Sequence, residues 1–152
     1  QELKQDEKIR YIGVTSTRRV NYPILEKAMR DYPLDFIGVD YAIDNQDAAD
    51  KILPLAQELG IATLIYAPFG RSRLFSGVKG LALPEWAQEF DIDSWGKFFL
   101  KYIVSHPGVT CVTPATSKAR NMLDNIGAAY GELPDAVTRK KMATLIAELP
   151  VG

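Results

Sequence analysis

The sequence predicts an α/β protein whose strands form one parallel sheet. Short apolar segments alternate with segments in which apolar residues recur at helical spacing, which is typical of strand–helix–strand units. The apolar segments are nearly continuous, as expected for strands that crossover helices cover. At 152 residues, with 47% hydrophobic and 24% charged residues, the chain is long enough for one domain with a proper core.

Four segments are predicted as strands: 9–15 (IRYIGVT), 34–42 (LDFIGVDYA), 61–67 (IATLIYA) and 109–113 (VTCVT). The last of these contains Cys111, the only cysteine, which we interpret as a small buried hydrophobe. A single thiol cannot form an internal disulfide, so the sequence indicates either a reducing compartment or no dependence on one.

Helical spacing fills the intervals between these strands. The first two helices have apolar faces formed by Ile24, Leu25, Ala28 and Met29, and by Ala48, Ile52, Leu55, Ala56 and Leu59. Pro54 removes one backbone donor from the second helix and is expected to bend it.

Three further helices are predicted in the second half of the chain. Asp93 or Ser94 can cap the first of them, and its buried stripe is Trp95, Phe98, Phe99, Tyr102 and Ile103. In the next helix we expect Met122, Leu123 and Ile126 to face inward. A final helix follows Pro134 and carries Met142, Leu145, Ile146 and Leu149.

Residues 68–83 are predicted to form a long loop rich in Gly, Ser and Arg. Loops of this length in compact domains are usually functional or mobile. Arg71, Arg73 and Lys79 give it positive charge, which fits either a phosphate-binding flap or a solvated surface. The formal net charge of the whole chain is −1, and no basic run suggests a nucleic-acid surface.

The stretch 112–125 (VTPATSKARNMLDN) leads from the fourth strand into a helix. Free backbone N–H groups at a helix start attract anions. Thr116 and Ser117 therefore fit two interpretations: an N-cap that the helix itself needs, or part of a phosphate-binding turn.

Three stretches resemble the aldo/keto reductase family: residues 8–16 (KIRYIGVTS), 60–70 (GIATLIYAPFG) and 94–125, which ends in VTPATSKARNMLDN. That family folds as an eight-stranded (β/α) barrel, and the resemblance covers strands five to eight. It implies a parallel (β/α)4 half of a TIM-type barrel with an extra C-terminal helix. Residues 1–152 would form a single domain.

The resemblance also implies a nicotinamide cofactor, with NADP(H) expected and NAD(H) as the alternative. Tyr66 would stack on the nicotinamide ring, with Thr15 and Ser16 at the carboxamide and Asp40 where the family usually has Gln. The pyrophosphate would pass along Ala67, Pro68, Phe69, Gly70 and Arg71. The ribose phosphate would meet Thr116, Ser117 and Lys118. The adenine would be reached by Asp124 and Asn125.

The chain departs from the family pattern at several positions. NADPH-dependent members commonly have Lys at the position of Ala115 and Arg at the position of Asn121. An ionised Asp40 cannot donate the hydrogen bond that Gln can. The catalytic Asp, Tyr, Lys and His of the family lie on the first barrel half, so the resemblance implies no catalytic residue in this chain and no activity of the chain alone.

Other polar residues are predicted to be structural. His106, the only histidine, precedes the fourth strand, at the end of the sheet opposite a barrel's active site. Asp44, Asp47 and Asp50 flank a helix start and lack calcium-loop spacing, so we expect no metal site there.

Four barrel strands leave two unpaired edges and an apolar inner face. The missing half, a second copy, or the terminal helix and long loop could cover them; we expect a homodimer. A small carbonyl substrate would bind only with the first half supplied. We also expect a cytoplasmic protein that binds neither nucleic acid nor membrane.

Three functional hypotheses follow. The chain, which starts at Gln1, is the C-terminal part of an aldo/keto reductase whose upstream residues were removed or not included. Alternatively it is a non-catalytic half-barrel that binds a nucleotide or phosphate ligand. The third hypothesis is a purely structural, self-associating module.

Overall fold

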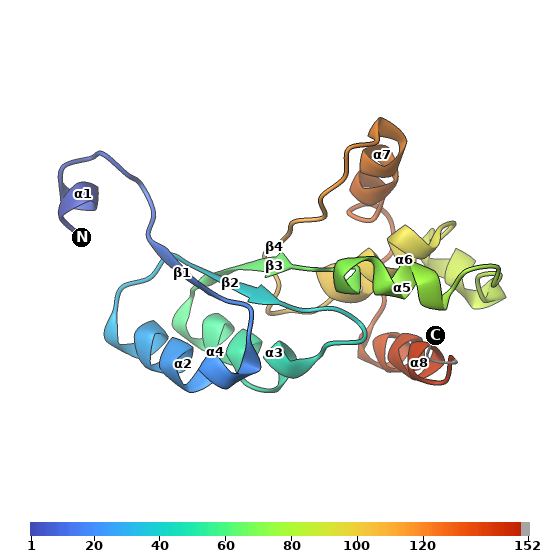
Figure 1. The fold of residues 1–152 in the computed structure, drawn as a ribbon, viewed down its shortest axis with the longest axis horizontal. Helices are drawn as coiled ribbons and strands as arrows, with labels where there is room; N and C mark the ends of the chain where they lie inside the picture. Colours follow the sequence, from blue (N-terminus) through green and yellow to red (C-terminus); the bar gives the residue numbers. More distant parts are fainter. Residues whose placement is uncertain (150–152) are drawn as a thin grey trace.

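The computed structural model describes residues 1–149 and contains a four-stranded parallel sheet (Figure 1). Its strands are β1 (Gly13–Ser16), β2 (Phe36–Asp40), β3 (Ala62–Tyr66) and β4 (Cys111–Val112), which pair in the order β1-β2-β3-β4. All three pairings are parallel. The predicted α/β class and the four predicted strands are therefore confirmed, although each strand is shorter than its apolar segment.

Helices connect and flank these strands. The α-helices are α1 (Glu2–Gln5), α2 (Tyr22–Asp31), α3 (Asp47–Asp50), α4 (Ile52–Leu59), α5 (Arg73–Gly77), α6 (Trp95–Val104), α7 (Ala119–Gly127) and α8 (Ala136–Ala147). Three short 3-10 helices are η1 (Arg19–Asn21), η2 (Gly70–Ser72) and η3 (Glu85–Phe90). The predicted long loop thus contains two helical turns, η2 and α5.

Pro54 has a stronger effect than the predicted bend. The predicted helix divides at Lys51 into α3 and α4. The ψ of Lys51 is helical at −43°, but its φ of −146° is not. Pro54 lacks the N–H that would bond to the carbonyl of Asp50, and its ring crowds that carbonyl. The break at Lys51 therefore lies three residues before the proline, next to the carbonyl that loses its donor.

The two faces of the sheet differ in burial. On the face that α2 and α4 cover, Ile37, Val39 and Ile65 are fully buried and Thr63 is 1% exposed. The opposite face carries the alternate residues of each strand, and we call it the inner face. Its side chains are half-buried or exposed, apart from Asp40. The core of the protein thus lies between the sheet and its helices, and no element among residues 1–149 covers the inner face.

Cys111 lies on this inner face. Its neighbour in register is Leu64, which alternates with the buried Thr63 and Ile65. The thiol is exposed, so the prediction of a buried cysteine is wrong. A strand position in a parallel sheet is buried only if both faces are covered, and here one face is open.

The apolar face predicted for α7 is also exposed. Met122 is 41%, Leu123 71% and Ile126 48% exposed, and Figure 1 shows α7 standing away from the strands. The helix contacts α6 through its other side, where Asp124 approaches Gly96. Its apolar face has no strand to cover, because no strand of the described part of the chain pairs with the outer edge of β4.

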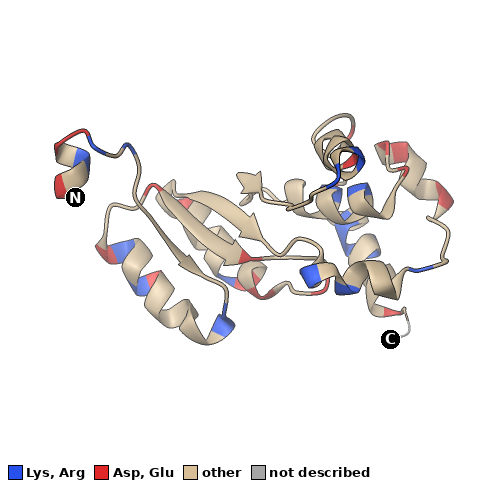
Figure 2. Cartoon of the chain, turned by 45° about the horizontal axis from the view of Figure 1, so that its top comes forward, with Lys and Arg blue, Asp and Glu red and all other residues tan. Residues whose placement is uncertain are grey.

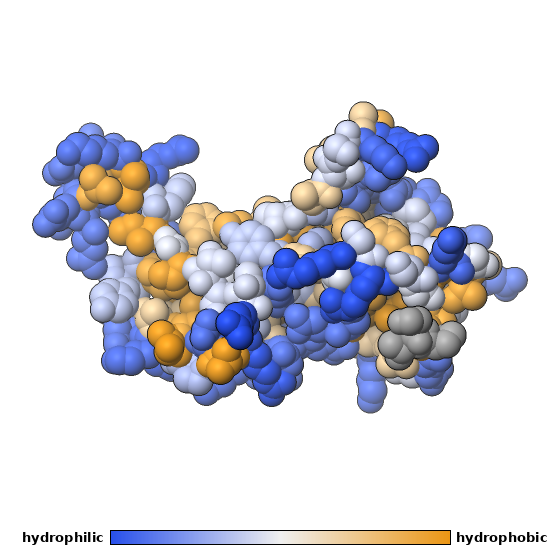
Figure 3. All heavy atoms as spheres, viewed as in Figure 1, coloured by the Kyte–Doolittle hydropathy of each residue, from blue (hydrophilic) through white to orange (hydrophobic). Residues whose placement is uncertain are grey.

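Exposed apolar side chains also occur near the N-terminus. The prediction for α2 holds for Leu25 and Met29, which are buried, but Ile24 is 72% exposed because it lies beside the buried stripe. Hydrophobic residues are visible at the surface around α1 and α2 in Figure 3. Leu3 is 51% and Val20 72% exposed.

The C-terminal helix α8 packs on the helix-covered side and leaves the inner face open (Figure 1). Met142 of α8 is fully buried in the core, and Arg139 donates to the hydroxyl of the buried Tyr41 at 3.2 Å. The stripe predicted for α6 is confirmed for Phe98, Phe99, Tyr102 and Ile103, which are buried, while Trp95 is half-buried at the start of the helix.

Within residues 1–149, the helices are all too short or too polar to cross a lipid bilayer.

Candidate functional site

The carboxyl ends of the strands bring several predicted site residues to one edge of the sheet. Because the strands are parallel, Ser16, Asp40 and Tyr66 end neighbouring strands on the same side. Asp40 and Tyr66 are direct partners in register. The residues predicted at the carboxamide and the ring therefore do lie together.

Tyr66 lies on the inner face against Gly38. A Cβ atom on Gly38 would come within 2.4 Å of Cε2 and 2.9 Å of Oη of Tyr66, and within 2.8 Å of Oγ1 of Thr15. The ring thus extends back over the glycine toward Thr15. The absence of a side chain at position 38 leaves a flat platform formed by a half-buried aromatic ring with a hydroxyl beside it.

Thr15 and Ser16 point in different directions, as successive strand residues do. Thr15 is exposed on the inner face, whereas the Ser16 hydroxyl lies within 3.4 Å of the carbonyl of Arg18, to which it donates. Only Thr15 therefore presents its hydroxyl next to Tyr66.

Asp40 is the only charged residue in the four strands (Figure 2). It is 7% exposed. Oδ2 accepts a hydrogen bond from Nη2 of Arg71 at 3.0 Å, while Oδ1 is buried and has no donor among residues 1–149. A buried carboxylate oxygen without a donor is costly in free energy, so this arrangement is unusual for a structural residue.

The segment after β3 has an unusual backbone. Ala67, Gly70, Arg71 and Ser72 all have positive φ, between 49° and 76°. For a residue other than glycine, this left-handed conformation costs about 1 kcal/mol. Pro68 is buried, and the guanidinium of Arg71 bonds to Asp40 while 70% of the side chain stays exposed. The segment therefore folds back along the strand edge and is anchored there by an ion pair.

A cleft of about 400 Å³ lies beyond this segment. It is bounded by the turn after β3, the start of α6 and the start of α7. Its lining residues are Phe69, Ser72, Phe75, Ser94, Trp95, Gly96, Ala115, Thr116, Asn121, Asp124 and Asn125. Four predicted residues, Phe69, Thr116, Asp124 and Asn125, are thus brought together.

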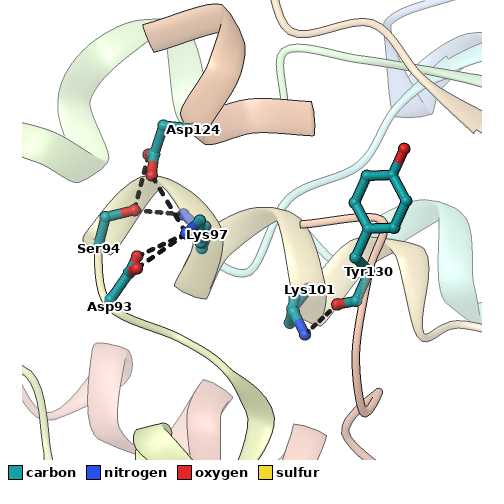
Figure 4. A network of polar contacts seen from close by, with 6 residues as sticks. All are labelled: Asp93, Ser94, Lys97, Lys101, Asp124 and Tyr130. Atoms are coloured by element: carbon teal, nitrogen blue, oxygen red, sulfur yellow. Dashed lines mark hydrogen bonds and ion pairs between the residues drawn. The ribbon is translucent and has the colours of Figure 1, made fainter. Parts of the chain in front are cut away.

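Polar contacts between α6 and α7 shape one wall of the cleft (Figure 4). Ser94 donates from its hydroxyl to Oδ2 of Asp124 at 2.7 Å and accepts from the backbone N–H of Lys97 at 3.0 Å. Lys97 pairs with Asp93 at 2.8 Å and approaches Oδ1 of Asp124 at 3.8 Å. The predicted cap of α6 is therefore Ser94, and its hydroxyl also holds Asp124 in place.

Two polar groups behind this wall have different environments. The Nδ2 atom of Asn125 is buried and has no acceptor within the described part of the chain. The fully buried Lys101 donates to the carbonyls of Tyr130 at 2.7 Å and Glu132 at 2.9 Å, and burial lowers its pKa. Lys101 thus fixes the connection from α7 to α8, while Asn125, which lines the cleft, retains a buried Nδ2 without an acceptor among the described residues.

The N-cap interpretation of Thr116 and Ser117 is wrong. Helix α7 begins at Ala119 and its N-cap is Lys118, which makes no capping contact through its side chain. The hydroxyl of Thr116 accepts from the N–H of Lys118 at 3.2 Å, but Thr116 lies two residues before the N-cap position. Thr116 lines the cleft, whereas Ser117 and Lys118 are exposed beside it.

Several cleft residues were not predicted as site residues from the sequence. Ser94 was identified only as a helix cap, and Ser72, Phe75 and Gly96 gave no local signal. Gly96 allows α7 to approach, because a Cβ atom there would lie 2.8 Å from Oδ2 of Asp124. Ala115 and Asn121 line the cleft without charge.

The remaining polar candidates lie elsewhere. His106 accepts from the N–H of Gly108 through Nδ1 at 3.0 Å and packs edge-on against Tyr41. Burial, and secondarily the charge of Arg139, lowers its pKa to about 4. Asp44 and Asp47 pair with Arg73 and Arg19. In residues 1–149 we find no cluster of His, Cys, Asp and Glu suited to a metal ion.

A larger cavity of about 540 Å³ lies between α5 and α8. Leu74, Val78 and Ile146 line it, with the Asp44–Arg73 ion pair at its side. None of the predicted site residues belongs to it.

Comparisons with known proteins point to one family. A model of the aldo/keto reductase family matches residues 1–142. The probable aldo-keto reductase 1 of Glycine max is 24% identical over 179 residues, which cover 99% of this chain and 49% of that protein.

Solved structures of aldo-keto reductases also match this chain. The holo form of aldo-keto reductase AKR11C1 from Bacillus halodurans superposes with a TM-score of 0.72 at 21% identity, covering 99% of this chain and 55% of that one. Its apo form gives the same TM-score and identity, with 56% of its chain covered. The chain thus spans about half the length of the relatives it matches, and the predicted partial barrel is confirmed.

Proposed function

Because this chain belongs to the aldo/keto reductase family, we propose that it is the dinucleotide-binding half of an NAD(P)H-dependent carbonyl or alcohol oxidoreductase. One observation carries this proposal. The polar and aromatic residues at the strand ends, Thr15, Asp40 and Tyr66, are joined by the segment 67–72 to a cleft of about 400 Å³. An elongated ligand with a flat polar ring at one end and a nucleoside at the other fits this layout.

The strand edge fits the nicotinamide. The Tyr66 ring offers a stacking surface over Gly38, and the Thr15 hydroxyl can donate to the carboxamide oxygen. Oδ1 of Asp40, which has no donor within residues 1–149, can accept from the carboxamide NH2 group. Ser16, held at the carbonyl of Arg18, would position the turn around Thr15. The unsatisfied oxygen therefore gains a partner when the ligand binds.

The segment 67–71 fits the pyrophosphate. Ala67, Pro68, Phe69 and Gly70 lie between the ring platform and the cleft, and Arg71 brings a positive charge whose side chain is 70% exposed. Lys118 is exposed near Thr116 at the far end. Both cations can attract phosphate oxygens.

The cleft fits the adenosine portion and favours NAD(H). Asp124 and Asn125 line it together with Thr116, and the free Nδ2 donor of Asn125 suits a base nitrogen. The cleft lining contains the Asp124 carboxylate but neither Lys nor Arg. A 2′-phosphate would therefore meet no lining cation, whereas a 2′-hydroxyl can donate to a carboxylate or amide.

Catalysis needs residues beyond those in this chain. When bound, the dinucleotide supplies a hydride to a carbonyl or accepts one from an alcohol. The residues of this half bind and orient it, and hold its ring against the strand edge. We propose that the proton-transferring Asp, Tyr, Lys and His implied by the family resemblance belong to the other barrel half, so the isolated chain is inactive.

Titration calorimetry with NAD⁺, NADH, NADP⁺ and NADPH tests the binding proposal. We expect saturable binding that the Tyr66→Ala variant weakens about tenfold, because the stacking surface is lost. Tyr32→Ala is the matched control, since Tyr32 is 61% exposed at the end of α2. Lack of saturation with every dinucleotide at millimolar concentration would contradict the proposal and leave the purely structural role.

A second (β/α)4 unit is proposed to cover the inner face and the apolar side of α7. In the absence of the other barrel half, we expect a second copy of this chain to do so, as a homodimer. Sedimentation velocity should detect the dimer. Alkylation of the inner-face thiol Cys111 should slow as protein concentration rises. A monomer with unchanged Cys111 reactivity at high concentration would contradict this partner.

A further inference from the structure

Asp40 gives the inner face of the strands a single negatively charged side chain. It is the only charged residue in the strands, it is 7% exposed, and its register partner is Tyr66. The strand position paired with the residue that forms the proposed ring platform therefore carries a carboxylate.

Arg71 neutralises this charge only in part. Its guanidinium reaches Oδ2 from the following turn, and with 70% of its side chain exposed it is largely screened by solvent. The second oxygen, Oδ1, is buried without a donor among the described residues. The side of the carboxylate without a donor therefore keeps negative potential that water does not screen.

We infer that Asp40 makes this site select the oxidised form of the nicotinamide dinucleotide over the reduced form. The inference rests on the proposed function. The carboxamide is present in both forms, so a hydrogen bond to Oδ1 does not discriminate between them. The ring is a pyridinium cation in the oxidised form and neutral in the reduced form. A nearby carboxylate of low exposure stabilises only the cation, by Coulomb attraction.

Arg71 acts in the opposite direction on the same preference. Its positive charge on Oδ2 offsets part of the potential that the pyridinium would experience. Removing Arg71 should therefore strengthen the selectivity for the oxidised form, whereas removing the charge of Asp40 should abolish it. Opposite effects from two paired residues distinguish an electrostatic cause from a general disturbance of the site.

The experiment measures dissociation constants for NAD⁺ and NADH by calorimetry on the 152-residue chain and its variants. For the unmodified chain we expect NAD⁺ to bind about tenfold more tightly than NADH. Asp40→Asn keeps the size of the side chain and should bring the ratio to about one. Arg71→Gln should raise the ratio above that of the unmodified chain, so it tests the inference even if Asp40→Asn does not fold.

Asp50→Asn is the matched control, because it removes the same charge at an exposed position in α3 and should leave the ratio unchanged. Saturable binding of both forms with equal affinity would overturn this inference and leave the proposed function intact. Failure of both forms to bind would overturn the proposed function and this inference together.

Discussion

Gly38 and Tyr66 occupy complementary space on the inner face, since a Cβ atom at position 38 would lie 2.4 Å from the tyrosine ring. The glycine on β2 thereby determines where the aromatic side chain of β3 can lie.

Gly38→Ala should displace the Tyr66 ring from the sheet. We expect dinucleotide binding to weaken about tenfold, and the free energy of unfolding to fall by about 1–3 kcal/mol through overpacking. Calorimetry and chemical denaturation measure the two effects. Gly77→Ala is the control, because a Cβ atom there would meet no atom within 4 Å. Unchanged binding in Gly38→Ala would show that the ring position does not matter.

Ser94→Ala should affect both stability and binding. The variant loses the cap of α6 and the hydrogen bond to Asp124, so we expect a loss of about 1 kcal/mol in stability together with weaker binding of adenosine nucleotides. Asp135→Ala removes the cap of α8, where Oδ1 accepts from Thr138, and should lower the melting temperature without changing binding. Equal effects of both variants on binding would refute a role of Ser94 in the cleft.

Asn121→Arg should shift the preference between dinucleotides. Asn121 lines the cleft without charge, and a guanidinium there could form a charge-assisted hydrogen bond to a 2′-phosphate. We expect the affinity for NADP⁺ relative to NAD⁺ to rise about tenfold. Gln57→Arg adds the same charge on the exposed side of α4 and should leave this ratio unchanged. A gain of equal size in both variants would indicate non-specific attraction.

His106 should make the stability depend on pH. Its pKa is about 4 in the folded chain and has the ordinary value of 6.5 in the unfolded chain. Between these two values the unfolded chain binds more protons, so stability falls as pH is lowered from 6.5 to 4. Because His106 is partly exposed, we expect the free energy of unfolding to fall by only about 1–2 kcal/mol over this pH range.

The variant His106→Asn isolates this contribution. The asparagine side chain retains an acceptor for the N–H of Gly108 but does not titrate. Urea unfolding of both proteins across this pH range gives the difference directly. Parallel stability curves for the two proteins would assign the pH dependence to other groups.

The sequence predicted the strands and their shared edge because both depend on local patterns. Continuous apolar runs identified the strands, and the carboxyl ends of parallel strands necessarily meet at one edge. The stripe of α6 was equally clear, since Phe98, Phe99 and Ile103 recur at helical spacing. The assignment of Asp40 and Tyr66 to one ligand came from the family resemblance, and the parallel register brings the two residues side by side.

What the sequence could not predict depends on distant partners. The pairing of Asp40 with Arg71 spans 31 residues and requires left-handed backbone at a residue with no preference for it. The contact between Ser94 and Asp124 likewise spans 30 residues. Cys111 and Leu123 have the pattern of buried residues, yet no described residues cover them. A sequence pattern shows that a side chain favours burial, but it does not show whether another element packs against it.

The order β1-β2-β3-β4 also determines how the chain can assemble. Each strand pairs with the strand made just before it, so a nascent polypeptide can add one strand and its helix at a time while it leaves the ribosome. The last strand to pair is β4, which contains only two residues. The sheet therefore grows in one direction. The strand that is synthesised last, β4, is also the one held by the fewest residue pairs.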